Sequence, residues 1–279
     1  MPKPILSYTY DKNDTTLLEL VQRHVGAVET TADTISFMMN NKATLNEEIV
    51  AQLNALSSTH KILSHGVGLS IGSYSGYSEA YLALMDELYQ EVPLYWHSEH
   101  LGYTTVDGEN INVMLPVNRN DECLAMICKR VEQIQKRYPI PFLLENIAHL
   151  LPDYNCIYSE AEFLNAIVRN TGCGLILDVY NIACDVHNFG FNMDDFLAKL
   201  NLDAVKEIHL ANGSIYKDKM MDIHSRAVSE DVLQKTKEII PSLKNLEFVT
   251  YELMPEAIPS MGYVAIEQEL IRIKNTLEL

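Results

Sequence analysis

The sequence predicts an α/β protein of the (β/α)8 type, a closed TIM barrel. Apolar runs rich in β-forming residues occur eight times along the chain, and a segment with helical spacing follows each of them. Eight such alternations favour a closed parallel barrel over an open sheet. Extended polar segments follow the fourth and seventh runs, where this architecture carries its active-site loops.

The expected elements follow one another in a regular order. The strands are Ile5–Tyr10, Gly26–Thr30, Lys61–His65, Leu94–His100, Pro141–Glu145, Gly174–Asp178, Val205–Leu210 and Leu246–Glu252. The helices are Thr15–Val25, Asn46–Leu56, Ser78–Glu91, Asp121–Arg137, Glu160–Asn170, Met193–Leu200, Ser229–Ile240 and Val264–Leu277. Asn46, Ser159 and Ser229 each stand before acidic residues, a pattern typical of helix N-termini, where the helix dipole favours negative charge.

One domain, residues 1–279, accounts for the sequence. A length of 279 residues suits one large barrel, and 47% hydrophobic residues supply a full core. No stretch resembles a linker or a low-complexity tract. The segment Gly102–Arg119, with its turn-like VDGEN, predicts a long loop or small hairpin, and Asn212–Met221 predicts a polar loop.

Composition indicates a cytoplasmic protein that binds neither membranes nor nucleic acid. No run approaches the roughly 18 apolar residues that span a bilayer, and the N-terminus does not resemble a signal peptide. The five cysteines are an odd set without CxxC, as expected of free thiols in a reducing compartment. The formal net charge of −17 disfavours phosphate contacts and suits metal ions or a cationic partner, although it could also serve solubility alone.

Polar residues end six consecutive predicted strands. They are His65, His100, Glu145 with Asn146, Asp178 followed by Asn181, His209 with the Asp222-x-His224 pair beyond it, and Glu252. Because parallel strands end on one rim of a barrel, these side chains are expected to share one cavity. So many carboxylates and imidazoles need a compensating charge, and mixed His/Asp/Glu ligation suits Zn, Fe or Mn. The set exceeds what one ion can use, so about two or three ions are predicted.

Each residue alone has a more ordinary interpretation, since a strand-end histidine is more often a hydrogen-bonded loop residue than a ligand. The joint pattern favours the ligand interpretation for the four strand-end histidines. His97 is expected to be structural, as are His24, His60 and His149, while His187 is placed in a loop after the sixth strand. The glycines of HGVGLSIGS lack the GK[ST] of a nucleotide loop, and no nucleophile arrangement stands out.

The ordered series HG, SEHLGY, LLEN, LDVYN, EIHLA and DIHS, with a final strand-end Glu, resembles the multinuclear non-heme iron-dependent oxidases. This family was long catalogued as a domain of unknown function. The motifs spread from about Leu63 to Pro259, and the ordered set is specific although each motif is short. The resemblance implies a barrel that holds about two or three irons, in mixed Fe(II)/Fe(III) states. It also implies O2 as co-substrate in the oxidation of cysteines of a ribosomally made precursor peptide.

The resemblance also implies roles for single residues and a partner. Glu145 would bridge two ions, and His65, His100, Glu145, Asp178, His209 and Glu252 would be catalytic. His65 and His100 would hold one ion, Asp178, His209 and Glu252 a second, and Asn181, Asp222 and His224 a third. A small MbnC-like protein that recognises the peptide leader would form a heterodimer with the chain.

This chain departs from the family pattern in the surroundings of the expected ligands. Phe189 stands where a histidine is expected, HLANG replaces HLAGH, and YEL replaces the ERD that ends the eighth strand. Within the family the chain looks most like the methanobactin-maturation branch (MbnB), which converts a cysteine into an oxazolone with an adjacent thioamide. The departures leave the substrate open.

Other functions use the same barrel. Endonuclease IV, with three zinc ions, has a ligand order that can be laid over the same positions, except that Asn181 replaces a histidine. The charge of −17 argues against such a DNA-directed phosphodiesterase. A sugar isomerase of the xylose-isomerase type would need a metal-adjacent lysine that cannot be located here. A non-enzymatic metal store or adaptor is the remaining alternative.

Overall fold

The computed structural model describes residues 3–10, 14–39 and 42–279, and within them eight parallel strands close into a barrel. Around the barrel these are β1 (Ile5–Thr9), β2 (Ala27–Thr30), β5 (Lys61–Gly66), β6 (Leu94–His100), β9 (Phe142–Glu145), β10 (Gly174–Asp178), β11 (Val205–Leu210) and β14 (Phe248–Tyr251), which pairs again with β1. The predicted TIM barrel is confirmed, and the strands match their predicted ranges to within about two residues.

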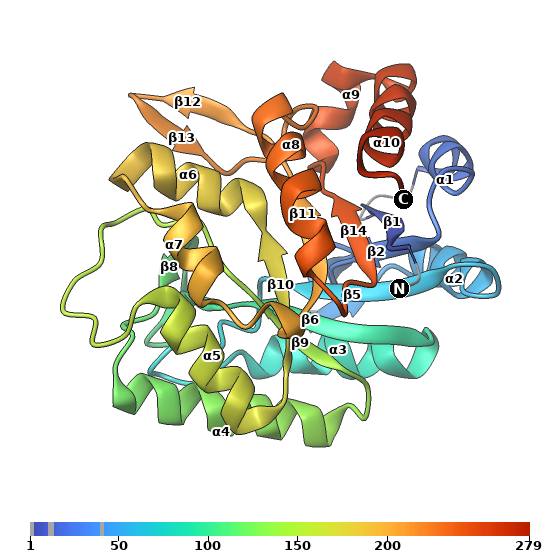
Figure 1. Ribbon diagram of the computed structural model, residues 1–279. Helices are drawn as coiled ribbons and strands as arrows, with labels where there is room; N and C mark the ends of the chain where they lie inside the picture. Colours follow the sequence, from blue (N-terminus) through green and yellow to red (C-terminus); the bar gives the residue numbers. More distant parts are fainter. Residues whose placement is uncertain (1–2, 11–13, 40–41) are drawn as a thin grey trace.

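Helices surround the barrel on its outer side (Figure 1). They are α1 (Thr15–Val21), α2 (Glu47–Leu56), α3 (Glu79–Glu91), α4 (Asp121–Arg137), α5 (Glu160–Thr171), α6 (Val179–Phe189), α7 (Met193–Lys199), α8 (Glu230–Ile239), α9 (Ile258–Met261) and α10 (Tyr263–Leu277). The first of these ends four residues earlier than predicted, because a tight turn follows in which His24 N–H donates to Val21 O. None of the described helices has both the length and the apolar character that crossing a bilayer requires.

Helix α6 was not predicted, and the placement of His187 in a loop after the sixth strand is wrong. The helix begins directly at the end of β10, with Asp178 as both the last strand residue and the N-cap. Asp178 Oδ1 accepts the backbone N–H of Asn181 at 2.6 Å. The helix ends at Gly190, whose φ of +69° is the left-handed conformation that favours glycine at this position.

Three antiparallel hairpins project from the barrel: β3 (Ser36–Met39) with β4 (Lys42–Leu45), β7 (Gly102–Val106) with β8 (Glu109–Pro116), and β12 (Ser214–Tyr216) with β13 (Lys219–Met221). The second hairpin lies in the segment Gly102–Arg119, for which the sequence predicts a long loop or a small hairpin. It turns at Asp107–Gly108, a strong hairpin signal. The third corrects the prediction of a polar loop. Its turn residues Lys217 and Asp218 both have positive φ, and this pair is an uncommon hairpin signal.

The barrel interior is built in layers by the two-residue repeat of a β-strand. Its apolar floor consists of Ala27, Leu63, Trp96, Leu143, Ile176 and Phe248. The rings of Trp96 and Phe248 meet edge to face with centroids 4.9 Å apart, a contact worth about 0.5–1.5 kcal/mol beyond the area that it buries. Two positions further along these strands, polar side chains follow: Glu29, His65, Ser98, Glu145, Asp178 and Thr250.

Strand register brings the polar layer together. His100 on β6 lies level with Glu145 on β9, and Asp178 on β10 lies level with His209 on β11. His209 is in turn level with Thr250, two residues before Glu252. Neighbouring strands lie about 4.8 Å apart, so side chains at one level and on one face meet in the interior.

Gly66 gives a test of the packing at the end of β5. A β-carbon there would overlap Glu99 Oε1 and the Tyr81 hydroxyl, both buried. We expect Gly66→Ala to lower the free energy of unfolding by about 1–3 kcal/mol, because neither neighbour can move into solvent. Urea unfolding measures the change. In a Tyr81→Phe background the same substitution should cost less, and equal costs in both backgrounds would contradict this account.

Candidate metal centre

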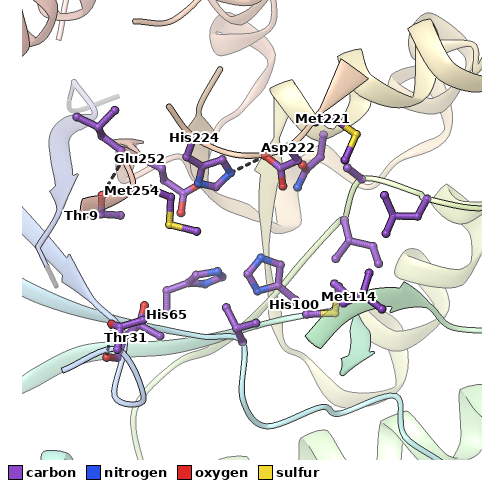
Figure 2. Close-up of a pocket in the computed structure, with 18 of the residues that line it drawn as sticks. Thr9, Thr31, His65, His100, Met114, Met221, Asp222, His224, Glu252 and Met254 are labelled. Carbon is purple, nitrogen blue, oxygen red and sulfur yellow. Dashed lines mark hydrogen bonds and ion pairs between the residues drawn. The ribbon is translucent and has the colours of Figure 1, made fainter. Parts of the chain in front are cut away.

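A cavity of about 370 Å3 opens at the carboxyl ends of the barrel strands. Six of the nine predicted ligands line it: His65, His100, Asn181, Asp222, His224 and Glu252. The other three, Glu145, Asp178 and His209, are buried and have donor atoms close to those of Glu252 or the histidines. Figure 2 shows the His65 and His100 rings side by side on one wall, opposite Asp222, His224 and Glu252. The structure therefore brings all nine together.

His65 and His100 present the same ring nitrogen to one carboxylate. Their Nε2 atoms lie 2.9 and 3.2 Å from Glu145 Oε2. The Nδ1 atom of His100 is 3.0 Å from Gly66 O, which can only accept, so this nitrogen carries the proton. Ser98 Oγ donates to Ser64 O and can therefore accept from His65 Nδ1 at 2.9 Å. Both rings thus turn an Nε2 lone pair toward the cavity floor.

Glu145 lies between this histidine pair and a second group. Its Oε1 atom is 3.1 Å from His209 Nδ1, while its Oε2 atom faces His65 and His100. His209 Nδ1 is also 3.2 Å from Glu252 Oε2. Donor atoms of Glu145, Asp178, His209 and Glu252 all lie within 4.8 Å of one another. One carboxylate is therefore shared by two sets of donor atoms.

Asn146 holds the backbone of Asp178 at the end of β10 and the side chain of Asn181. Its amide accepts from the backbone N–H of Asp178 at 2.9 Å and donates to Asp178 O at 3.0 Å. Asn181 Nδ2 donates to Asn146 O at 3.0 Å, and Asn181 Oδ1 has no hydrogen-bond partner among the residues that the structure describes. Asp178 Oδ2 is likewise unpartnered and buried, because only Oδ1 caps α6. Two oxygen donors are thus free on this side of the cavity.

Asp222 and His224 form an ion pair on the opposite wall, with 2.6 Å between Asp222 Oδ1 and His224 Nε2 (Figure 2). His224 Nδ1 lies 3.7 Å from Glu252 Oε2. The φ of His224 is +40°, a conformation that L-residues rarely adopt, and its carbonyl is held by the N–H of Met254 at 2.9 Å. Backbone strain at this position is thus coupled to the placement of an imidazole in the site.

The titration of these groups reflects their crowding. Burial alone would raise the pKa of Glu145, but three neighbouring imidazoles outweigh burial and hold this pKa well below its usual range. Burial and the charge of Glu145 raise the pKa of Asp178 well above its usual range. Against the effect of burial, surrounding carboxylates raise the pKa of His209 well above normal and that of His224 to about 10. Without a cation, the cluster can reduce its charge only by sharing protons.

The donor set fits metal ions. Two buried oxygens of the site, Asp178 Oδ2 and Asn181 Oδ1, have no partner among the described residues. Five further donor atoms contact only other members of the site at ion-pair distance, without hydrogen-bond geometry: His65 Nε2, Glu145 Oε2, Asp222 Oδ1, His224 Nε2 and Glu252 Oε2. In the part of the chain that the structure describes, the site carboxylates form ion pairs with histidines and none with lysine or arginine. Unpartnered buried polar atoms are costly, and a cation removes that cost. Clusters of His, Glu and Asp that could hold metal ions are therefore present at this site.

The strand-end pattern did not predict two buried acids of the barrel interior. Glu29 on β2 and Glu207 on β11 are fully buried, with oxygens 3.4 and 3.6 Å from His209 Nε2. Burial and the charge of Glu207 raise the pKa of Glu29 well above its usual range. A signal for Glu207 existed, since it precedes His209 by two residues and therefore shares its strand face. Glu29 is a lone acid within the apolar run AVET, which gave a weaker signal.

The remaining histidines lie away from this donor cluster. His97 faces the helices outside the barrel and contacts Glu99 at 2.9 Å. His24 pairs with Glu267, and His60 contacts Gln22 O. His187, on α6, contacts Asp218 O at the tip of the third hairpin. Each of the four thus has a hydrogen-bond or ion-pair partner outside the donor cluster.

His149 belongs to a buried ion-pair network beside the cavity. The Asp185 carboxylate makes two contacts with His149: it accepts the backbone N–H at 2.8 Å and pairs with the ring Nδ1. Arg119 lies 3.5 Å from its Nε2 atom and pairs with Asp153. Burial raises the pKa of the adjacent Glu160 to about 7, with a further contribution from the charge of Asp185. Donor atoms of His149, Glu160 and Asp185 lie within 4.8 Å of one another, so this buried group could also hold a metal ion, although Arg119 lies beside it.

Phe189, the departure noted in the sequence, lies outside the donor cluster. It lines a neighbouring cavity of about 320 Å3 together with Phe191, Leu151 and His149. Lys219 on β13 stands over its ring at 4.5 Å. The residue therefore contributes an apolar wall next to the site.

Comparison with known protein families gives one match over nearly the whole chain. The family described as "RiPP precursor modification enzyme MbnB/TglH/ChrH" matches residues 18–275. RiPPs are ribosomally synthesised and post-translationally modified peptides. The match supports the resemblance that the strand-end motifs indicated.

Curated relatives agree over a shorter stretch. A UPF0276 protein of Caulobacter vibrioides is 33% identical over 180 residues, which is 64% of each chain. A UPF0276 protein of Bordetella pertussis is 38% identical over 181 residues, 65% of this chain and 61% of the relative. The chain thus spans somewhat less than two thirds of the length of the curated relatives it matches.

Solved structures with this fold are distant in sequence. A xylose isomerase domain-containing protein of Salmonella typhimurium superposes with a TM-score of 0.67 at 14% identity, covering 98% of this chain and 97% of the other. Endonuclease IV of Thermus thermophilus gives a TM-score of 0.58 at 14% identity, with 96% and 99% covered. Such identities establish the fold alone, and the fold is the expected xylose-isomerase-like barrel.

The network around Glu160 gives a pH-dependent prediction. Its pKa is about 7 in the folded protein and near 4.5 in an unfolded chain, so the unfolded state loses this proton first as pH rises. This residue therefore lowers stability progressively between pH 4.5 and 7, by at most about 3 kcal/mol. Glu160→Gln should gain stability relative to the natural protein from pH 5 to pH 8, measured as the difference in Tm.

The matched control is Glu47→Gln, at the first position of α2, where the side chain is exposed. Its Tm difference should stay nearly constant over the same pH range. If the two variants respond to pH alike, burial of Glu160 is not the cause.

Proposed function

Because the chain belongs to the family of RiPP precursor modification enzymes MbnB/TglH/ChrH, we propose that it is an iron- and O2-dependent oxidase. Its substrate is a cysteine residue of a ribosomally made precursor peptide. The observation that carries this proposal is the set of buried nitrogen and oxygen donors around the barrel cavity that lack a well-formed hydrogen bond. Family membership is the reason for proposing a peptide substrate, and the mixed His/carboxylate donors suit iron.

The geometry supports assigning the donors to ions in three groups. The Nε2 atoms of His65 and His100, with Glu145 Oε2, would hold the first ion. Glu145 Oε1 with Asp178, His209 and Glu252 would hold the second, so that Glu145 bridges the two. Asn181, Asp222 and His224, which all line the cavity, would hold a third.

The cavity walls suit a peptide side chain. Met114 on the second hairpin, Met221 on the third and Met254 after β14 surround the donors, as Figure 2 shows. Flexible thioether side chains adapt to irregular apolar groups and exclude water from them. The residues of this chain would therefore position a peptide cysteine over the donors and keep the reacting atoms dry.

We favour the methanobactin-type reaction, in which a cysteine becomes an oxazolone with an adjacent thioamide. The peptide gives up four hydrogen atoms, and O2 takes them to become two molecules of water. Iron held by the donor set would supply the redox capacity to pass these electrons and would bind the cysteine as its thiolate, because soft sulfur ligands coordinate in the deprotonated form. The carboxylate-rich group beside Glu145 and Asp178 would favour the more highly charged ions.

A small leader-recognition protein of the MbnC type is the proposed partner. The net charge of −17 favours a cationic protein or peptide over nucleic acid. Tight binding to duplex DNA at physiological salt would instead favour a phosphodiesterase, the activity of endonuclease IV. Iron release without O2 consumption in the presence of the peptide would favour a metal store.

Metal content tests the donor assignment. Protein purified without oxygen should contain about two or three irons per chain. Asp178→Ala should lose about one ion together with all activity, because it deletes a donor of the second group. Glu145→Ala should lose more, because its carboxylate faces both groups. Elemental analysis against protein concentration gives these numbers.

Two controls separate metal loss from misfolding. Asp178→Asn keeps the N-cap of α6, since asparagine caps helices as well as aspartate does, and should still lose metal. Asp203→Ala, an exposed surface acid, should keep the full content. A folded and active protein that contains no metal would refute the proposal.

A substrate variant tests thiolate binding. Replacing the target cysteine of the precursor peptide by serine should leave the metal content unchanged but abolish O2 consumption and the mass loss of the product. The reason is that a serine hydroxyl does not replace a thiolate as a soft ligand. An O2 electrode and mass spectrometry measure the two effects. Oxidation of the serine peptide at the same rate would exclude direct sulfur ligation.

A further inference from the structure

His209 differs from the other two histidines of the cavity floor in which ring nitrogen faces the donor cluster. His65 and His100 turn Nε2 inward and have a hydrogen-bond acceptor at Nδ1. His209 turns Nδ1 inward, 3.1 Å from Glu145 Oε1 and 3.2 Å from Glu252 Oε2. Its Nε2 atom faces away from the cavity, toward Glu29 and Glu207. An acceptor at the outward nitrogen fixes which nitrogen keeps its lone pair.

The two acids behind His209 are not equivalent. Glu207 Oε1 accepts a hydrogen bond from the Thr250 hydroxyl and stands 3.6 Å from His209 Nε2. Glu29 is nearer, at 3.4 Å, and neither of its oxygens has a hydrogen-bond partner of good geometry among the described residues. A fully buried carboxyl group needs a donor, and His209 Nε2–H is within reach of it.

We propose that Glu29 is a positioning residue that holds the proton of His209 on Nε2, so that His209 binds its metal ion through Nδ1. This inference rests on the proposed metal site but concerns a residue outside the nine predicted ligands. Glu29 lies on β2 and His209 on β11, so the acid acts across the barrel interior rather than along one strand. With Ser98 and Gly66 O, it gives each floor histidine an acceptor at its outward nitrogen.

Ferrous ion alone is the probe for the test, added without oxygen to metal-stripped full-length protein in competition with a chelator. Glu29→Ala should weaken the binding of one ion by about 10–100-fold and leave the ion at His65 and His100 unchanged. Glu29→Gln should restore most of that affinity, because the amide oxygen still accepts from Nε2–H. Glu207→Gln, the matched control, should have a smaller effect on the affinity, since the Glu207 carboxylate already accepts a hydrogen bond from the Thr250 hydroxyl.

Cobalt substitution gives a readout that a purely structural role would not change. In the cobalt-loaded protein, the exchangeable ring N–H protons of bound histidines give shifted proton resonances that vanish in D2O. Glu29→Ala should shift or broaden one of these resonances and leave those of His65 and His100 in place. The Tm of the metal-stripped Glu29→Gln variant should stay close to that of the natural protein, because the amide has the same size and can still accept from His209 Nε2–H.

The outcomes distinguish this inference from the proposed function. If the natural protein binds no ferrous ion, both fail. If it binds about two or three ions and Glu29→Ala binds them with equal affinity and the same resonances, only the role of Glu29 fails. A large loss of Tm in both stripped Glu29 variants, with all ions weakened together, would also overturn it in favour of a structural role.

Discussion

The interior of the barrel concentrates more negative charge than its own residues can neutralise, and this constraint shapes everything around it. In the described part of the chain, the carboxylates that the barrel strands and the segments after them bring to this interior form ion pairs with imidazoles and not with lysine or arginine. A barrel tolerates such crowding because each strand is anchored below by an apolar floor, with Leu63, Leu143 and Ile176 two residues before a polar partner. The outward side of each floor histidine then needs an acceptor, and the surrounding strands provide one. Donor atoms with fixed directions are the result, which is what metal ligation requires.

Much of this could be predicted from sequence because a parallel barrel has simple geometry. Side chains repeat every two residues along a strand, and all strands end on one rim, so a polar residue at a strand end has a known position without any knowledge of contacts. For this reason His65, Glu145 and Asp178 could be grouped from their places at the ends of apolar runs. The same rule could have found Glu207, one repeat before His209. It could not assign Glu29 a partner, because the neighbour that matters lies on a strand about 180 residues away along the chain.

The missed elements have a different origin, since their conformations depend on tertiary contacts. The N-cap of helix α6 is Asp178, the residue that ends β10. No loop therefore separates the two-residue repeat of the strand from the helical repeat that follows it in the sequence. The third hairpin turns at Lys217–Asp218, residues that adopt positive φ less readily than Asn-Gly or Asp-Gly. It is held instead by α6, where the Asn188 amide donates to Met220 O at 2.9 Å and accepts from Met220 N at 2.8 Å. No local signal specifies such a contact, whereas Asp107–Gly108 specifies the second hairpin without help.

Helix α6 thereby joins the bottom of the cavity to its edge. At one end, an oxygen of Asp178 caps the first turn while the other oxygen belongs to the donor cluster. At the opposite end, the Asn188 side chain hydrogen-bonds to the backbone of Met220 on β13, the strand whose Met220 and Met221 line the cavity. A helix resists bending and stretching, so the backbone of Asp178 and that of Asn188 stay at a fixed separation. One helix thus carries both a donor of the charge cluster and a contact to the wall of the cavity opening.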